Sequence, residues 1–274
     1  MKQFSKLSYK LKDIIMYPKL KKIAQKYDNV DTIIYPSIIA IDSSENYSII
    51  LDENGLIWKF SVTNKDYKIL ISRRFLTKSI SCSRYYTLII DVDGNLWGFA
   101  YPDVSINIFG YRIEITRHLT KIELPFKVKN VSGDSYRILL IDDYNELWLC
   151  DIINGQNLID LEIKAKHVVT LGHCMIIDEN DDLWAFGRNY YGQLGLGHFI
   201  DVDQPIRVNL NFKVKNVVCG EQFTILLDQD DNLWGCGHHE GIIPRHSIFS
   251  RIYLDYKVDL IAAEKEKVAW TALY

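Results

Sequence analysis

The sequence predicts an all-β fold built from a repeated unit. Each unit has an acidic turn, preceded by three apolar residues and followed by an apolar residue and a Trp. Asn, Asp and Gly tolerate the backbone conformations of tight turns, so each unit contains a β-hairpin. A hairpin that recurs along the chain indicates a solenoid, a propeller or a β-array. The five copies read DENGLIW (52–58), DVDGNLW (91–97), DDYNELW (142–148), DENDDLW (178–184) and DQDDNLW (228–234).

A second landmark repeats along with the hairpin. The hexapeptide FKVKNV occurs at residues 126–131 and again at 212–217. Residues 256–270 align with 212–226 without gaps, so a sixth unit begins there and stops before its Trp strand. The repeated unit is therefore longer than the hairpin alone.

The expected strands follow the chain in order. Between the second and third units lies a longer insert, residues 101–118, and long connections are where a scaffold places binding residues. A loop without a binding role is the alternative for this insert. The strand regions are 38–41, 47–51 and 56–60 in the first unit, 79–90 and 96–100 in the second, 128–149 in the third, 167–186 in the fourth and 214–237 in the fifth.

The fourth and fifth units carry further patterns. In the fifth, a strand ending at Cys219 and Gly220 precedes Phe223, Thr224 and the hairpin. In the fourth, a G-x-N-x-x-G-Q-L-G-x-G run follows the Trp strand. Together these patterns resemble the regulator of chromosome condensation repeat, over roughly residues 38–270 and most clearly in the fourth unit. The run comprises Gly187, Asn189, Gly192, Gln193, Leu194, Gly195 and Gly197.

This resemblance implies a β-propeller. Five complete hairpins and a shared blade predict about six short four-stranded blades, with seven blades or an incomplete ring as alternatives. An open ring would leave unpaired backbone groups at its edge. We therefore expect strands near Thr32 to Ile41 to pair with the partial sixth unit. The propeller domain is assigned to residues 32–274.

Residues 1–31 form a separate basic extension. Leu7, Leu11, Ile14 and Ile15 follow a helical spacing until Pro18 interrupts it, so a short helical or disordered segment is expected outside the ring. Residues 1–26 hold eight Lys and one acid, net +7, whereas the remainder holds 24 basic and 34 acidic residues, net −10. An acidic body with a basic tail follows.

Several residues are interpreted as parts of the repeat and not as a site. Each Trp recurs once per unit on a strand, which favours packing between blades over an exposed ligand platform. The glycines of the fourth unit permit backbone conformations that other residues avoid, and the resemblance implies that their loop links one blade to the next. The repeat-structural residues are Trp58, Trp97, Trp148, Trp184, Trp234, Gly187, Gly192, Gln193, Gly195 and Gly197.

Composition predicts an intracellular protein, cytoplasmic or nuclear. The five cysteines are an odd number without a C-x-x-C pair, which favours a reducing compartment. The sequence has no apolar run of membrane-spanning length and no signal-peptide pattern at its N-terminus.

We predict no catalytic residue, cofactor or metal site. The sequence lacks a nucleophile elbow, an H-E-x-x-H motif, a Walker loop and a dinucleotide fingerprint. His173 occupies a repeat position that holds an aromatic residue in other units, so it is interpreted as a packing residue. The one metal-like cluster, interpreted as a polar turn, comprises Cys236, His238, His239, Glu240 and His246.

The function expected is that of a noncatalytic protein–protein interaction module, whose partner contacts loops on one rim of the ring. Exposed Tyr and Arg favour recognition. The candidate contacts are Arg188, Tyr190, Tyr191 and His198 in the glycine-rich loop, and Tyr111, Arg112 and His118 in the insert.

Two alternatives remain open. The resemblance implies guanine-nucleotide exchange on a small GTPase, which would be the partner. The second alternative is chromatin or nucleic-acid binding through the N-terminal lysines, since the acidic body should repel phosphate.

Overall fold

The computed structural model describes residues 38–43, 47–52, 54–61, 67–69, 76–100, 104–108, 111–115, 118–151, 159–264 and 267–272. Within these ranges every regular element is a β-strand, and no helix long and apolar enough to cross a membrane is present there. The extension expected at residues 1–31 lies outside the described residues.

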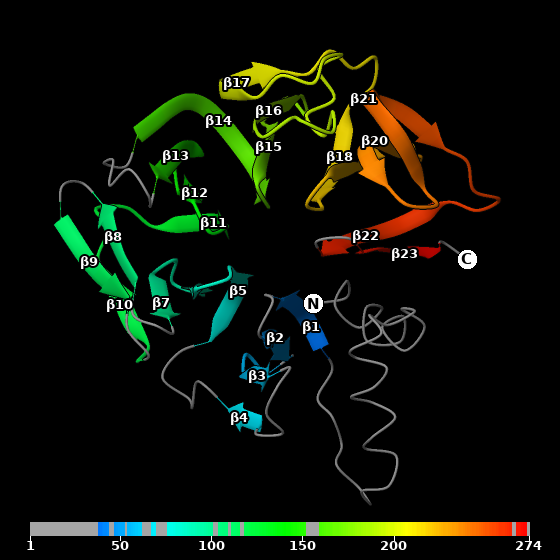
Figure 1. Cartoon of the computed structure of the whole chain (residues 1–274). Helices are drawn as coiled ribbons and strands as arrows, with labels where there is room; N and C mark the ends of the chain where they lie inside the picture. The colour runs from blue at the N-terminus through cyan, green and yellow to red at the C-terminus, as the bar shows by residue number, and fades with distance from the viewer. Residues whose placement is uncertain are drawn as a thin grey trace, which may run out of the picture.

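Antiparallel sheets follow one another around a ring (Figure 1). The first blade contains β1 (Ile38–Ser43), β2 (Tyr47–Asp52), β3 (Ile57–Ser61) and β4 (Tyr67–Ile69). The second contains β5 (Thr77–Cys82), β6 (Tyr86–Asp91), β7 (Leu96–Ala100) and β10 (Thr120–Ile122). The fifth contains β18 (Val214–Cys219), β19 (Phe223–Asp228), β20 (Leu233–His239) and β21 (Ile243–Ile252).

The third and fourth blades share one long strand. The third contains β11 (Val128–Gly133), β12 (Arg137–Asp142) and β13 (Glu146–Asp151), and the fourth contains β15 (His173–Asp178), β16 (Leu183–Gly187) and β17 (Val202–Arg207). β14 (Ile159–Thr170) pairs with β13 through its first half and with β15 through its second half. Glu162, with φ of 55°, lies within the β13-paired half.

The insert between the second and third units is itself a hairpin. β8 (Val104–Ile108) and β9 (Tyr111–Ile115) form a two-stranded ribbon between β7 and β10. In Figure 1 this ribbon lies at the outside of the ring. The connection expected here therefore has a regular structure of its own.

The last sheet has two strands within the described residues, β22 (Val258–Glu264) and β23 (Lys267–Ala272). Five four-stranded blades are thus followed by a two-stranded sixth. The expectation that Ile38 to Ile41 would complete this sheet is wrong, because these residues pair with β2 in the first blade. Residues 32–37 lie outside the described residues.

Apolar cores lie between neighbouring blades. For example, Met175 and Ile177 of β15 cluster with Val214 and Val217 of β18. Equivalent buried clusters join the first blade to the second, the second to the third, the third to the fourth, and the fifth to β22. Each blade is therefore stabilised by burial against the next.

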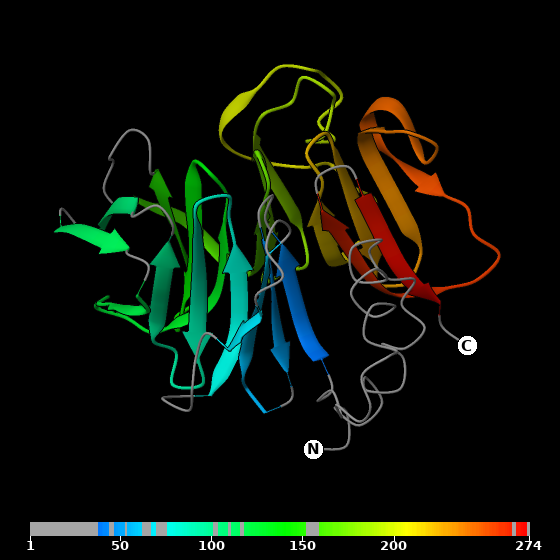
Figure 2. The ribbon, with the colours of Figure 1, turned by 60° about the horizontal axis from the view of Figure 1, so that its bottom comes forward.

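The alternating strand directions create two rims. The turn rim carries the turns between second and third strands, residues 91–95, 142–146, 178–182 and 228–232, and the connections between blades. The loop rim carries residues 83–85, 134–136, 171–172, 188–201, 220–222 and 240–242. In Figure 2 the loops before β17 and the tip of the β20–β21 hairpin stand at the top, on the loop rim.

Candidate partner-binding surface

On the turn rim, the first Asp of each repeated turn organises its hairpin. Oδ1 of Asp228 accepts the backbone N–H groups of Asp230 and Asn232, and Oδ2 accepts Nε1–H of Trp234 at 2.8 Å. Burial raises the pKa of Asp228, but these donors outweigh burial and hold the pKa below its ordinary 3.8. The other Asp–Trp pairs are Asp91–Trp97, Asp142–Trp148 and Asp178–Trp184.

The Trp rings have one apolar and one polar environment. Trp97, Trp148, Trp184 and Trp234 are half-buried and each packs against a cluster between blades. The ring of Trp234 also stacks on Phe212, with centroids 4.4 Å apart. The Trp58 side chain lies outside the description. The four Trp rings pack between blades and bond to the turns, which argues against a platform of exposed rings that binds a ligand.

Lysines bond to the turns along the turn rim, some within one blade and some between neighbouring blades. Lys213, directly before β18, bonds Asp182 of the preceding blade at 2.7 Å, and Lys215 pairs with Asp231 of its own blade. Isolated exposed ion pairs contribute little to stability, but this regular series shows that the rim is occupied by the repeat's own contacts. The series continues with Lys127–Asn95, Lys129–Asn145, Lys164–Glu146 and Lys166–Asp181.

On the loop rim, the glycine-rich loop is held together by buried Asn189. Its Nδ2 donates to the carbonyl oxygens of His198 and Ile200, at 2.9 and 3.1 Å, and its Oδ1 accepts the Leu194 N–H at 3.0 Å. The Asn189 N–H donates to Asp201 at 2.7 Å. Asn189, at the start of the loop, is thus bonded to residues in its middle and at its end.

The glycines let this loop approach the next blade. Gly192 has φ of 84°, and a Cβ there would lie 2.6 Å from the His246 carbonyl oxygen. A Cβ at Gly195 would lie 2.3 Å from the Phe249 ring, and Gly197 N–H donates to the Ser247 carbonyl at 2.7 Å. The loop is therefore docked on β21.

A buried hydrogen-bond chain continues this contact. Thr224 Oγ1–H donates to the Gln193 carbonyl oxygen at 2.7 Å, so His173 Nε2–H donates to Thr224 Oγ1, also at 2.7 Å. Burial lowers the pKa of His173 to about 3. The imidazole is therefore neutral, and its placement is that of a packing residue between the fourth and fifth blades.

The docked loop creates an arginine–aromatic cluster, which we define as Arg245, Tyr190, Tyr191 and Phe199. The Arg245 guanidinium carbon lies 5.2, 5.8 and 4.8 Å from the three ring centroids, in that order. Its Nη2 donates to the Tyr190 carbonyl at 2.7 Å. Tyr190 is 66% exposed and Phe199 is 44% exposed. The cluster is thus held in place and open to solvent.

A second pair extends this surface toward the third blade. The Arg188 guanidinium carbon lies 5.2 Å from the Tyr136 ring centroid, and Tyr136 is 40% exposed. Ile200 of the loop and Ile248 of β21 add exposed apolar side chains. The surface therefore combines cations, aromatic rings and aliphatic groups.

The structure groups some predicted contacts and separates others. Arg188, Tyr190 and Tyr191 lie on this surface, whereas half-buried His198 turns inward and its Nδ1 accepts the Ile200 N–H at 3.2 Å. Residues 111 and 112 open β9, and their side chains lie outside the description. His118 is exposed before β10. Figure 1 shows the β8–β9 ribbon and the glycine-rich loop on different blades, so the two sets do not form one surface.

The metal-like cluster is dispersed. Cys236 is buried with its thiol 3.2 Å from the Gln193 carbonyl, while His238 stacks on Tyr191 and His239 meets Phe223 edge-on. No group of three metal-ligating side chains comes together in the part of the chain that the structure describes. The five cysteines are buried and none forms a disulfide, and burial raises the pKa of Cys174 to about 12.

Sequence reasoning missed the aliphatic members of the surface, Ile200 and Ile248, and three of its cationic and aromatic members. Arg245 and Tyr136 lie far from the glycine-rich loop in sequence, and only packing of neighbouring blades brings them to it. Phe199 lies inside the loop, where its aromatic character was the available signal.

One family model matches a segment that includes the glycine-rich loop. Residues 180–227 match the model of the Regulator of chromosome condensation (RCC1) repeat. The Protein RCC2 homolog of Xenopus laevis is 37% identical over 67 residues, 24% of this chain and 13% of that protein. The secretion-regulating guanine nucleotide exchange factor of Bos taurus is 35% identical over 93 residues, 32% of this chain and 20% of that protein. The aligned part thus spans a fifth or less of these curated relatives.

Solved structures resemble the whole ring. Prp20p from Saccharomyces cerevisiae has a TM-score of 0.71 at 14% identity, covering 90% of this chain and 70% of that one. Human WBSCR16 has a TM-score of 0.73 at 12% identity, covering 87% and 72%. At these identities the likeness shows the fold alone. The recognition of RCC1-like repeats and of an all-β propeller from the sequence is confirmed.

Proposed function

We propose that this propeller is a noncatalytic protein-interaction module whose partner binds the loop rim at the arginine–aromatic cluster. The observation that carries this proposal is the fixed, exposed guanidinium of Arg245 among three aromatic rings. Tyr and Arg dominate the binding energy of protein interfaces, and fixing them beforehand lowers the entropy cost of association.

The surroundings of the cluster support a partner that offers acidic and apolar side chains together. The Arg245 guanidinium donates to the Tyr190 carbonyl, and the Arg188 guanidinium lies over the Tyr136 ring. Neither guanidinium forms an ion pair within the described ranges, so both can bond to carboxylates of a partner. Ile200 and Ile248 supply apolar area beside them.

Affinity purification from a lysate of the source organism tests this proposal. We expect the full-length protein to retain a specific set of proteins, and Tyr190→Ala and Arg245→Ala to lose them. Tyr144→Ala is the matched control, because Tyr144 is 71% exposed but lies on the turn rim. Retention of the same proteins by all variants, with unchanged thermal unfolding, would contradict the proposal.

Guanine-nucleotide exchange on a small GTPase is the second candidate. It is favoured by similarity to the Bos taurus exchange factor and to the guanine nucleotide exchange factor SRM1 of Saccharomyces cerevisiae. Prp20p is described by its binding to Gsp1p and histones. An exchange factor stabilises the nucleotide-free GTPase, so a GTPase captured only from nucleotide-depleted lysate would favour this candidate. Capture that is independent of nucleotide would favour the interaction module.

A further inference from the structure

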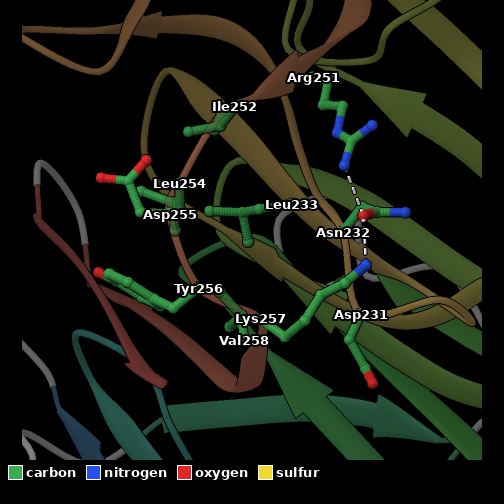
Figure 3. A pocket seen from close by; sticks show the side chains of 10 residues that line it. All are labelled: Asp231, Asn232, Leu233, Arg251, Ile252, Leu254, Asp255, Tyr256, Lys257 and Val258. Carbon is green, nitrogen blue, oxygen red and sulfur yellow. Dashed lines mark hydrogen bonds between the residues drawn. The ribbon is translucent and has the colours of Figure 1, made fainter. Parts of the chain in front are cut away.

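A cavity of about 170 Å³ lies on the turn rim, between the fifth blade and the last sheet. Its walls come from residues 231–233, 251–252 and 254–258 (Figure 3). Arg251 and Lys257 reach Asn232 from opposite directions, and both donate to its Oδ1 at 2.7 Å. Two cations therefore converge on one neutral oxygen.

The orientation of Asn232 is fixed by the hairpin. Its Nδ2 donates to Asp228 Oδ2 at 2.9 Å, which turns the amide oxygen toward the cations. Lys257 also donates to the Asp230 carbonyl at 2.6 Å. The two positive groups are consequently held in place before any ligand arrives.

The carboxylates around the cavity are engaged elsewhere or face away. Asp228 accepts four donors from its own hairpin, and Asp231 pairs with Lys215. The side chain of Asp255 lies on the far side of the cavity from Arg251 and Lys257, as Figure 3 shows. Asp230 is exposed. Neither Arg251 nor Lys257 forms an ion pair within the described part of the chain.

At the equivalent position of the fourth blade, a carboxylate takes the place of the Asn232 amide. Arg207 and Lys213 correspond to Arg251 and Lys257, and both bond to Asp182, at 2.6 and 2.7 Å. Hydrogen bonds from Lys213 and Arg207 hold the pKa of Asp182 below its ordinary 3.8. There the two cations are neutralised by the protein itself.

The position between the second and third blades is intermediate. A cavity of about 230 Å³ occurs there, and Lys127 donates to the amide oxygen of Asn95 at 2.6 Å. The second cation, Lys121, instead pairs with Glu123 at 3.0 Å. Of these three equivalent positions, the one at Asn232 alone keeps both cations on a neutral acceptor.

We propose that this cavity is an anion site that binds a phosphate group through Arg251 and Lys257. A guanidinium presents several donors in one plane and an ammonium acts as a point charge, a combination suited to phosphate oxygens. Leu233, Ile252, Leu254 and Tyr256 line the rest of the cavity, so an organic group attached to the phosphate has apolar surface to contact.

Isothermal titration calorimetry of the full chain with inorganic phosphate and with phenyl phosphate tests this site. Asn232→Asp should place a carboxylate between the two cations, as Asp182 does one blade earlier, and weaken binding of both probes about tenfold or more. Tighter binding of phenyl phosphate than of inorganic phosphate would assign the phosphate to an organic carrier. The arrangement at Asp182 beside Asp178 indicates that this variant folds.

Arg251→Ala and Arg207→Ala form the matched pair. Both remove an exposed turn-rim arginine, but only Arg251 lies on the cavity. We expect phosphate binding to be lost in the first variant and unchanged in the second. Equal loss in both would show a diffuse charge effect, and unchanged affinity in Asn232→Asp would equally overturn the proposal.

Discussion

Along the turn rim, Asp91, Asp142, Asp178 and Asp228 repeat one set of hydrogen bonds, whereas the loop rim differs from blade to blade. The second blade carries a ribbon there, and the fourth carries a glycine-rich loop docked on the fifth. Residues that recur in successive blades make contacts within the ring. A partner is therefore more easily bound where one blade differs from the others. The following variants test that distinction.

The largest loss of stability should come from Asp228→Ala on the turn rim. It leaves Trp234 Nε1–H and two backbone N–H groups without their acceptor, which should lower the free energy of unfolding by about 3 kcal/mol or more. Urea unfolding measures this change. Asp230→Ala is the control, because Asp230 is exposed and should cost less than about 0.5 kcal/mol. Equal losses of stability in the two variants would contradict the stabilising role of the Asp228 hydrogen bonds on the turn rim.

On the loop rim, Gly192→Ala should cost more than Gly172→Ala. Both glycines have positive φ, 84° and 81°, but a Cβ meets the His246 backbone only at Gly192. We expect losses of about 3 and 1 kcal/mol, respectively, because the first adds a steric clash to the backbone strain. The difference between the two urea transitions isolates the docking of the loop on β21, and its absence would mean that the loop adjusts.

Acid should weaken the two rims at different pH. Folding holds His173 neutral with a pKa of about 3, whereas the unfolded chain protonates it near 6.5, so stability is lost as pH falls below 6.5. Between pH 7 and 5 the loss from His173 should be about 2 kcal/mol. The turn-rim carboxylates Asp91 and Asp228 have lowered pKa values and lose their contribution only below about pH 3.8.

Stability of the wild type and of His173→Gln, measured from pH 7 to 5, separates these contributions. The Gln amide can still donate to Thr224 but does not titrate. His167 also has a pKa lowered by burial and remains in both proteins. A wild-type slope no steeper than that of the variant would contradict the assignment to His173.

The smallest change should follow Tyr190→Ala in the arginine–aromatic cluster. Because its ring is mostly exposed, we expect less than about 0.5 kcal/mol of lost stability. Urea unfolding measures it, and partner capture is scored separately. A loss above about 1 kcal/mol would show that the Tyr190 side chain stabilises the glycine-rich loop. The loop rim would then contribute to stability as the turn rim does.

Local patterns in the sequence predicted the hairpins, because an acidic turn and its flanking strands act over a few residues. The strand regions that had been given bounds between residues 38 and 237 were confirmed. The Asp–Trp bond was visible as a constant spacing but was interpreted only as a turn signal. The β8–β9 ribbon was also missed, although residues 104–108 and 111–115 alternate apolar and polar side chains.

Other features depend on contacts between distant segments. Ile38 to Ile41 were expected to complete the last sheet, but they pair with β2, which lies next in sequence. Arg245 and Tyr190 meet because the glycine-rich loop docks on the next blade, a contact that no single repeat predicts. The difference between Asp182 and Asn232 was present in the aligned turns, yet its consequence required the lysine and arginine side chains around it.

The strand shared by the third and fourth blades has a consequence for how the ring opens. β14 is hydrogen-bonded to β13 along one half and to β15 along the other, so neither blade can separate without disturbing the same continuous backbone. Cooperative units of unfolding often follow such connected motifs. Amide hydrogens from β11 to β17 should therefore exchange with deuterium as one unit, slower than those of β22 and β23.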